Sequence, residues 1–432
     1  MLYFSTNNKN EIANFKEATL NGLAPDNGLY FPQTIPLLNE DFIKNINEYS
    51  DEAIAYKVIL PYVGDTIPAD ILKNIVEETI NFPIPLIKIN EQIFSLELFH
   101  GPTLAFKDVG ARFMSRCLGY FLKDQTKKVT VLVATSGDTG GAVAHGFYGV
   151  PNVEVIILYP SGKVSTVQEK QLTSLGKNIH ALEVNGSFDD CQQMVKETFA
   201  HAADFNHLFL TSANSINVAR WLPQQFYYFL AYKQWADKNN PPVISVPSGN
   251  FGNICAGLLA NTSGLPVKHF IAACNANDVI PQFFETDQYH PKKTIATISN
   301  AMDVGNPSNF VRILQIFNHQ VDDLKKKMTA CSINDAETKA VLKKVYNSFH
   351  YLLDPHAAVG YAALENYLQK HPAQKGIVIE TAHPVKFFDV VEPVIHAPVT
   401  IPSAIQHQLT LPKKSILMEN NTAALKEFLL KM

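Results

Sequence analysis

The residue with the clearest potential for chemistry is Lys107, which lies in the stretch Leu98-Phe-His-Gly-Pro-Thr-Leu-Ala-Phe-Lys107-Asp-Val-Gly-Ala-Arg112. It follows a Gly-Pro turn, precedes a small-residue helix start, and has Phe99, Leu104 and Phe106 as apolar neighbours. Desolvation lowers the pKa of a lysine, which is the condition for using its amine as a nucleophile or in a Schiff base. A lysine that merely begins a helix is the alternative that this stretch alone leaves open.

A first glycine-rich loop, Ala134-Thr-Ser-Gly-Asp-Thr-Gly-Gly141, follows a continuous apolar run. A strand entering such a turn points backbone N–H groups and a helix N-terminus at one place, which suits a carboxylate or phosphate. Thr135, Ser136 and Thr139 add hydroxyl donors. The loop is neither a GxGxxG nor a Walker motif, so dinucleotide or triphosphate binding is unsupported, and a tight structural turn is the alternative.

A second loop, Ser245-Val-Pro-Ser-Gly-Asn-Phe-Gly-Asn253, repeats this plan in the second half of the chain. Gly249 and Gly252 allow close approach of the backbone, and Asn250 and Asn253 can donate side-chain hydrogen bonds. Such a loop at a helix N-terminus suits one phosphate monoester, although a tight strand-to-helix turn would look the same. Two such loops at the carboxyl ends of parallel strands favour a ligand between lobes.

Two more polar clusters could contribute. Ser212-Ala-Asn-Ser215-Ile-Asn-Val-Ala-Arg220 offers a hydroxyl, amides and a guanidinium within two helical turns. Arginine binds a dianionic phosphate well, but a helix cap with a surface arginine is an equally good reading. Thr381 places a hydroxyl at the end of an apolar run, where a simple strand-end threonine is the alternative.

These features together form a set that fits pyridoxal 5′-phosphate. The lysine would form the Schiff base, the second loop would grip the 5′-phosphate, and the pyridine ring would serve as an electron sink. The Ser215–Arg220 cluster supplies a second anion site, so the substrate itself could be phosphorylated. H-E-x-x-H, G-x-S-x-G and paired-carboxylate patterns are absent from the sequence, so a catalytic metal and Ser-His-Asp chemistry have little support.

The elements that must position these loops alternate between strands and helices. Continuous β-branched runs predict buried strands at 129–134, 153–158, 179–184, 242–246, 269–274 and 376–380. Apolar residues at helical spacing predict helices near 39–49, 69–81, 139–149, 164–175, 188–204, 216–238, 309–328, 334–349, 357–370 and 421–432. This alternation predicts an α/β fold of two doubly wound, mostly parallel-sheet lobes with right-handed crossovers and the cofactor in the cleft between them.

The 432 residues are too many for one ordinary core, so we expect two or three regions. Residues 1–90 read as a mixed N-terminal region. A smaller α/β lobe over 91–210 would carry Lys107 and the first loop, and a larger α/β lobe over 211–432 would carry the second loop. Phe82-Pro-Ile-Pro-Leu86 joins the first two regions because its prolines cannot continue a helix.

The amino-acid composition limits the partners and the cellular compartment that we expect for the protein. A net charge of -4 gives no global reason to expect nucleic acid as a partner. The five cysteines are odd in number and never form C-x-x-C, which fits a reducing compartment. The sequence shows neither a signal peptide nor an apolar stretch near 18 residues, so we expect no membrane contact and a cytoplasmic protein.

Several long motifs in the same order resemble the threonine synthases, a family of the tryptophan-synthase-β-like (fold type II) pyridoxal-phosphate enzymes. Beyond Leu98–Gly110, Ser136–Gly141, Asn214–Arg220 and Gly249–Asn253, the motifs are Gly28-Leu-Tyr-Phe-Pro, Ser299-Asn-Ala-Met-Asp303, Asp354-Pro-His-Ala-Ala358 and Thr381-Ala-His-Pro. The resemblance therefore runs nearly from end to end.

The resemblance implies a role for each candidate residue. Lys107 would be the Schiff-base lysine and proton shuttle, and Thr381 would bond the pyridine nitrogen. The cofactor phosphate loop would comprise Gly249, Asn250, Phe251, Gly252 and Asn253. The substrate carboxylate would meet Thr135, Ser136 and Thr139, and the substrate phosphate would meet Ser215, Arg220 and Asn250. Many relatives place Asn beside the cofactor's 3′-oxygen, whereas this chain has Asp138, an acceptor in place of a donor.

The activity that the resemblance implies is that of a lyase. It would convert O-phospho-L-homoserine and water into L-threonine and phosphate, the last step of threonine biosynthesis in the aspartate-family pathway. Alternatives are another fold type II lyase, similar to serine/threonine dehydratases or cysteine synthases, and a non-catalytic homologue that binds a phosphorylated ligand. We expect a small-molecule substrate and a monomer or homodimer.

Overall fold

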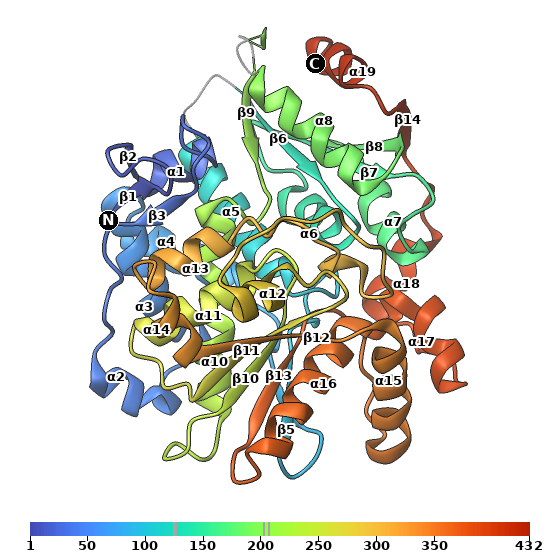
Figure 1. The fold of residues 1–432 in the computed structure, drawn as a ribbon. Helices are drawn as coiled ribbons and strands as arrows, with labels where there is room; N and C mark the ends of the chain where they lie inside the picture. Colours follow the sequence, from blue (N-terminus) through green and yellow to red (C-terminus); the bar gives the residue numbers. More distant parts are fainter. Residues whose placement is uncertain (124–127, 202–203, 206–207) are drawn as a thin grey trace.

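The computed structural model describes residues 1–123, 128–201, 204–205 and 208–432. Figure 1 shows two α/β lobes, one above the other, with an N-terminal layer at their side. Both lobes are built on largely parallel sheets, which confirms the predicted fold class.

The smaller lobe is built on a parallel sheet with strand order β14-β8-β7-β6-β9. Its strands are β6 (Val129–Ala134), β7 (Val153–Pro160), β8 (Ile179–Asn185), β9 (Phe209–Ser212) and β14 (Ser415–Glu419). Its helices are α6 (Asp138–Phe147), α7 (Thr166–Thr173), α8 (Phe188–Ala200) and α19 (Thr422–Leu430). Every residue of β6 is buried, as expected for a strand covered on both faces.

The larger lobe has a sheet with order β12-β11-β10-β13-β5-β4, parallel except for the β4–β5 pair. Its strands are β4 (Leu86–Lys88), β5 (Ile93–Glu97), β10 (Val243–Pro247), β11 (His269–Cys274), β12 (Met328–Ser332) and β13 (Gly376–Glu380). Its helices are α9 (Val218–Trp221), α10 (Gln225–Gln234), α11 (Gly252–Thr262), α12 (Val279–Thr286), α13 (Phe310–Ile316), α14 (Val321–Lys327), α15 (Asp335–Phe349), α16 (Pro355–Lys370) and α17 (Phe388–Ile395). The helix α18 (Ser403–Thr410) packs against α7 of the smaller lobe.

Strands are exchanged across the expected region boundaries at 91 and 211. β5 lies within residues 91–210 but pairs with β13 in the larger sheet. β14 lies within residues 211–432 but pairs with β8 at the edge of the smaller sheet. The division of the chain into three regions stays a prediction. The strands of each large sheet, however, do not come from one continuous stretch of sequence.

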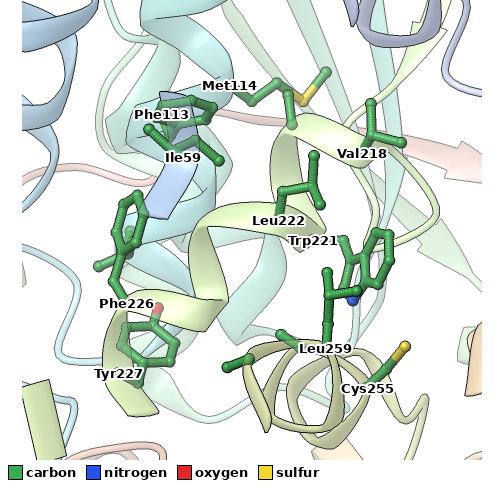
Figure 2. Packing of buried hydrophobic residues seen from close by; sticks show 14 of the residues in the cluster. Ile59, Phe113, Met114, Val218, Trp221, Leu222, Phe226, Tyr227, Cys255 and Leu259 are labelled. Atoms are coloured by element: carbon green, nitrogen blue, oxygen red, sulfur yellow. The ribbon is translucent and has the colours of Figure 1, made fainter. Parts of the chain in front are cut away.

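The N-terminal layer contains a small antiparallel sheet with strand order β2-β1-β3, against which α1 packs, and further helices. Its elements are β1 (Leu2–Ser5), β2 (Ile12–Asn14), β3 (Tyr30–Pro32), α1 (Phe15–Asn21), α2 (Glu40–Lys44), α3 (Asp51–Val63), α4 (Ala69–Thr79) and α5 (Lys107–Phe121), the last continuing the chain into the lobes. Figure 2 shows side chains from α3, α5, α9, α10 and α11 meeting in one core, with Trp221 and Phe113 fully buried. This core holds the helix that begins at Lys107.

The predicted strands and most predicted helices are present, with ends shifted by a few residues. Several elements were not predicted, among them α1, α3, α12, α17, α18, β1, β2, β4, β5, β9, β12 and β14. Pro61 lies inside α3 and breaks the helical signal there, although Ser50 caps its N-terminus. The end of the predicted helix at 188–204 falls on residues 202–203, which lie outside the described residues. In the described ranges, no helix is both long and apolar enough to cross a bilayer.

Candidate active site

A cleft of about 1010 Å³ opens between the lobes. All of the residues expected at the site line this cleft, although their individual roles stay predictions. They are Lys107, Thr135, Ser136, Asp138, Thr139, Ser215, Arg220, Gly249, Asn250, Phe251, Gly252, Asn253 and Thr381. The topology explains this convergence, because β6, β10 and β13 all end at the cleft.

Lys107 is brought to Thr381 by main-chain pairing between two segments that are distant in sequence. Ala105 forms an antiparallel bridge with Ala382. The Phe106 N–H donates to the Thr381 carbonyl at 2.9 Å, and the His383 N–H donates to the Leu104 carbonyl at 3.0 Å. Lys107 then begins α5, so its backbone position is set by the carboxyl end of β13.

The environment of Lys107 shifts its amine towards the neutral form. Its side chain is 18% exposed, and its Nζ lies 5.1 Å from the centre of the Phe106 ring. Burial lowers the pKa of Lys107, the carboxylate of Asp138 opposes that change, and the cations of Lys386 and Arg220 reinforce it. A neutral amine is the nucleophilic form of lysine.

Much of the hydrogen-bonding capacity of the first loop is used within the loop itself. The Thr135 hydroxyl oxygen accepts hydrogen bonds from the N–H groups of Gly137 at 2.9 Å and Gly140 at 2.8 Å. Thr135 is fully buried, whereas Ser136 and Thr139 are partly exposed to the cleft. The hydroxyl of Thr135 therefore shapes the turn, and the hydroxyls of Ser136 and Thr139 remain more accessible to a ligand.

Asp138, at the first turn of α6, is paired with a lysine that the sequence analysis did not identify. Its Oδ1 lies 2.8 Å from Lys386 Nζ, and both side chains are buried. Its Oδ2 lies 3.8 Å from Lys107 Nζ. Burial would raise the pKa of this carboxyl, but Lys386 and Lys107 hold the pKa well below its usual range. At the position where many relatives have an asparagine amide, this chain thus has the ionised carboxylate of Asp138 with two lysine neighbours.

The second loop is held in a strained and crowded conformation. Phe251 has a φ of 60°, in the left-handed region, and caps the N-terminus of α11. A Cβ on Gly249 would lie 2.6 Å from the Cα of Met302, so only glycine fits against that backbone. Both features bring the start of α11 and the loop around Met302 close to the cleft.

Asn253 at the start of α11 leaves one buried donor unused. The Tyr228 hydroxyl donates to its Oδ1 at 2.7 Å, which fixes the orientation of the amide. Its Nδ2 has no hydrogen-bond partner within the described part of the chain. A buried, unused donor is costly unless a ligand satisfies it. A helix N-terminus with such a donor and a nearby nucleophilic lysine fits pyridoxal phosphate, with the phosphate at this loop.

Ser215 is oriented by two amides. Its Oγ accepts from Asn250 Nδ2 at 2.7 Å and from Asn309 Nδ2 at 3.1 Å. Two accepted bonds leave the hydroxyl hydrogen free to donate to another group. Asn250 also accepts from the Ser308 N–H at 2.6 Å, so it connects the second loop to the Ser215 segment.

Arg220 is buried and lines the same cleft as Ser215. Its Nη1 donates to the Ala213 carbonyl at 2.5 Å, while its Nε finds no partner among the described residues. Burial lowers the pKa of the guanidinium to about 10, so it remains a cation at neutral pH. A buried cation with an unused donor attracts an anion.

Four further residues that support the site carried no predicted role. Arg312 is fully buried, donates to the carbonyls of Tyr30, Ser215 and Ile216, and stacks on Trp221 at 4.4 Å. The others are Asn309, Lys386 and His356. Apolar neighbours in Phe310-Val-Arg312-Ile-Leu and Pro384-Val-Lys386-Phe-Phe are the same signal that identified Lys107.

His356 holds one wall of the cleft. Its Nε2 accepts from the Ala301 N–H at 3.1 Å, so its Nδ1 carries the hydrogen and donates to Asp354 at 2.6 Å. This hydrogen-bonded pair fixes the segment that packs against Gly249. The Asp354-Pro-His motif was noted in the sequence, but its residues were given no role.

Comparisons with known families cover almost the whole chain. Residues 79–380 match the family described as pyridoxal-phosphate dependent enzymes. Residues 2–80 match the threonine synthase N terminus, and residues 357–429 match the C-terminal region of threonine synthase.

Individual relatives agree with these matches. The threonine synthase of Serratia marcescens is 42% identical over 431 residues, covering 100% of this chain and 99% of that protein. The crystal structure of threonine synthase from Escherichia coli superposes with a TM-score of 0.94 at 41% identity, covering all of both chains. A threonine synthase structure from Brucella melitensis with bound PLP has a TM-score of 0.92 at 34% identity and covers 99% of this chain and 98% of that one.

Proposed function

The chain belongs to the threonine synthase family of fold type II, pyridoxal-phosphate-dependent lyases, and we propose on that premise how its own residues perform the reaction. The enzyme converts O-phospho-L-homoserine and water into L-threonine and phosphate. Pyridoxal phosphate, when bound, supplies the electron sink that stabilises negative charge at the substrate carbon.

The cofactor's binding residues follow from the second loop. Gly249–Asn253 and the N-terminus of α11 would bind the phosphate, with Asn253 Nδ2 as the side-chain donor. Lys107 would attach the cofactor through its amine, and Thr381 would bond the pyridine nitrogen. The pairing of residues 104–106 with 381–383 supports these two roles, because it holds both residues at one end of the cleft.

The substrate would bind at its two anionic ends. Ser136 and Thr139 would donate to its carboxylate, with Thr135 shaping the turn that presents them. Arg220 Nε and the Ser215 hydroxyl would bind its phosphate, and Asn250 would orient Ser215. These contacts hold the bond that breaks, between Cγ and the phosphate oxygen, next to two donors that stabilise the departing charge.

Lys107 would move protons at the reacting carbons. As a neutral amine it takes the proton from Cα, and as an ammonium it returns a proton later in the cycle. The carboxylate of Asp138, 3.8 Å from Nζ, would stabilise the ammonium in between. Water adds at Cβ after phosphate has left, so the atoms of substrate and water balance those of threonine and phosphate.

The observation that carries the substrate assignment is the buried Arg220 guanidinium, with an unused donor, in the cleft that the free Ser215 hydroxyl also lines. A dehydratase or cysteine synthase acts without a substrate phosphate at this place and gives no reason for a buried cation there. The whole-length match to threonine synthases, with its N- and C-terminal regions, also favours this reading over a non-catalytic homologue.

A product assay with purified protein tests the assignment. The protein with pyridoxal phosphate should form threonine and phosphate in equal amounts from O-phospho-L-homoserine. Arg220→Met should lower kcat/KM by ~10²-fold or more, since a charge-assisted hydrogen bond is lost. Phosphate release without threonine, or full turnover by Arg220→Met, would contradict the proposal.

We also propose a cellular location and an oligomeric state for the enzyme. All five cysteines are unpaired thiols, which supports a reducing compartment and a cytoplasmic location. The thirteen residues expected at the site line one cleft, and we propose a monomer or a homodimer. Light scattering distinguishes these two states.

A further inference from the structure

Lys386 is a fully buried lysine on the short 3-10 helix at Pro384–Phe387, which follows β13. Its Nζ lies 2.8 Å from Asp138 Oδ1, donates to the Thr103 carbonyl at 2.8 Å, and donates to Gln171 Oε1 at 2.9 Å. An ammonium has three hydrogens, and these three acceptors use all of them. Lys386 therefore has no hydrogen left for a ligand and can act only through its neighbours.

Asp138 has one restrained oxygen and one that faces the reactive amine. Oδ1 is bound by Lys386 and also accepts from Gln168 Nε2 at 3.0 Å. Oδ2 lies 3.8 Å from Lys107 Nζ. The Gln168 side chain is itself confined, because a Cβ on Gly137 would lie 2.4 Å from it. Lys386 and Gln168 thus fix the orientation of the carboxylate through Oδ1, the oxygen that does not face Lys107.

We propose that Lys386 is a positioning residue for the reaction: it fixes Asp138 so that Oδ2 faces Lys107, and its buried charge opposes protonation of the Lys107 amine. This inference rests on the proposed function, in which Lys107 is the reactive lysine. It also explains how an aspartate can stand where an amide is usual, because the buried lysine on its far side keeps it ionised and oriented.

The charges that face Lys107 come from four places. Asp138 lies at the start of α6, Lys386 follows β13, Arg220 lies on α9, and Asp354 caps α16. Asp138 and Asp354 favour the ammonium, whereas Lys386 and Arg220 disfavour it in addition to burial. The two anions and the two cations act in opposite directions, so burial decides the direction in which the pKa of Lys107 shifts. Removal of one cation should therefore change this pKa clearly.

Lys386 also joins the two lobes at this point. It follows β13 of the larger sheet, whereas Asp138, Gln168 and Gln171 lie on helices of the smaller lobe. The contacts of Lys386 with Asp138 and Gln171 therefore hold the smaller lobe against the segment that carries Thr381.

Competitive acetylation measures the reactivity of Lys107 directly. The full-length, cofactor-free protein is treated with trace acetic anhydride at a series of pH values, and the Lys107 peptide is quantified by mass spectrometry. Lys386→Met should raise the apparent pKa of Lys107 by ~1 unit or more, because a nearby cation is removed. Lys386→Met/Asp138→Asn should bring it back towards the wild-type value, because the carboxylate that then held the ammonium is gone.

Two variants control for structural damage. Lys386→Arg keeps the charge and should leave the apparent pKa of Lys107 within ~0.5 unit of the wild type. Lys413→Met removes a lysine at the surface that binds two carboxylates, Glu169 and Glu183, and should change nothing at Lys107.

The result that overturns the inference is an unchanged apparent pKa in Lys386→Met, or a rise that the second substitution does not reverse. Acetylation needs no turnover, so its outcome is separate from that of the product assay. If threonine is not formed but the reversible shift is found, the proposed function fails and the electrostatic role of Lys386 stands.

Discussion

The loop after β6 and the loop after β10 both join a buried parallel strand to a helix of small residues, yet they differ in charge. The first contains the ionised Asp138 between two lysines, and its Thr135 hydroxyl caps the turn. The second is neutral, with a strained Phe251 and an amide donor on Asn253 that has no partner among the described residues. One side of the cleft is suited to proton transfer, and the other to holding a phosphate.

The comparison shows why similar loop sequences need not have the same role. A helix N-terminus attracts an anion in both cases. In the first loop a carboxylate of the chain already lies at the helix start. In the second, Gly252 begins the helix and leaves the position open. The residue at the first helical position, rather than the glycine count, distinguishes the two.

The largest expected effect comes from removing the lysine between the loops. Lys107→Ala should lower kcat by more than ~10³-fold, because it removes both the attachment of the cofactor and the group that carries the proton. It should also abolish the visible absorbance of the bound cofactor, measured after gel filtration. Lys163→Ala, a lysine outside the cleft lining, serves as the control. Retained turnover in Lys107→Ala would place the proton carrier elsewhere.

Placing a negative charge in the neutral second loop should remove the difference in charge between the two loops. Asn253→Asp preserves the bond from Tyr228 but turns the unused donor into an acceptor. The affinity for pyridoxal phosphate should fall by ~10²-fold or more, since a charge-assisted hydrogen bond is lost and repulsion is added. Fluorescence titration of the cofactor-free protein measures this affinity. Asn261→Asp, at the other end of α11, is the control.

Glycine-to-alanine exchanges compare the packing of the two sides. Gly249→Ala would place a Cβ 2.6 Å from the Met302 backbone, so overpacking of ~1–3 kcal/mol should weaken cofactor binding about tenfold. Gly141→Ala in α6 would meet only the Gln171 side chain, at 3.3 Å, and should bind the cofactor nearly as the wild type does. The same titration measures both variants, and equal affinities would show that the second loop is not tightly confined.

The smallest expected effect concerns Glu380, a buried carboxyl at the end of β13. Burial, followed by the charge of Asp354, raises its pKa well above the usual value, in contrast to Asp138. A carboxyl whose pKa rises on folding stabilises below its unfolded pKa, and that stability is lost as pH rises towards the folded value.

Glu380→Gln should therefore reduce the loss of stability between pH 5 and pH 8 by ~1 kcal/mol, since one pKa unit corresponds to 1.36 kcal/mol. Urea unfolding at the two pH values measures the difference. Glu40→Gln, at a highly exposed position, is the control. An unchanged pH dependence in Glu380→Gln would mean that the carboxyl is ionised in the folded protein.

Sequence patterns predict the local parts of this structure well and the long-range parts less well. β11 and β13 match their predicted bounds because their continuous apolar runs are buried in the centre of a sheet. The joining of β5 to β13 could not be predicted, because periodicity describes a strand and not its partner. The thirteen cleft residues converge because each predicted loop follows a strand end or precedes a helix start.

The supporting residues were missed for a related reason. Lys386 and Arg312 lie among apolar residues as Lys107 does, but each needs a partner from a distant segment to have a role. Asn309 carries no local signal, since its contact with Ser215 depends on the fold of a loop. The chemistry of a motif is local, whereas the groups that tune it are assembled by tertiary structure.

The exchange of strands between the sheets also constrains how the protein can be made. The smaller sheet receives its edge strand β14 from residues 415–419, long after β8 has been synthesised. The larger sheet likewise holds β5 beside a strand from residues 376–380. During translation, neither lobe can close its sheet until the distal part of the chain has left the ribosome, so exposed strand edges persist for most of synthesis. A fragment cut at either expected boundary would lack a strand of the sheet it was meant to contain.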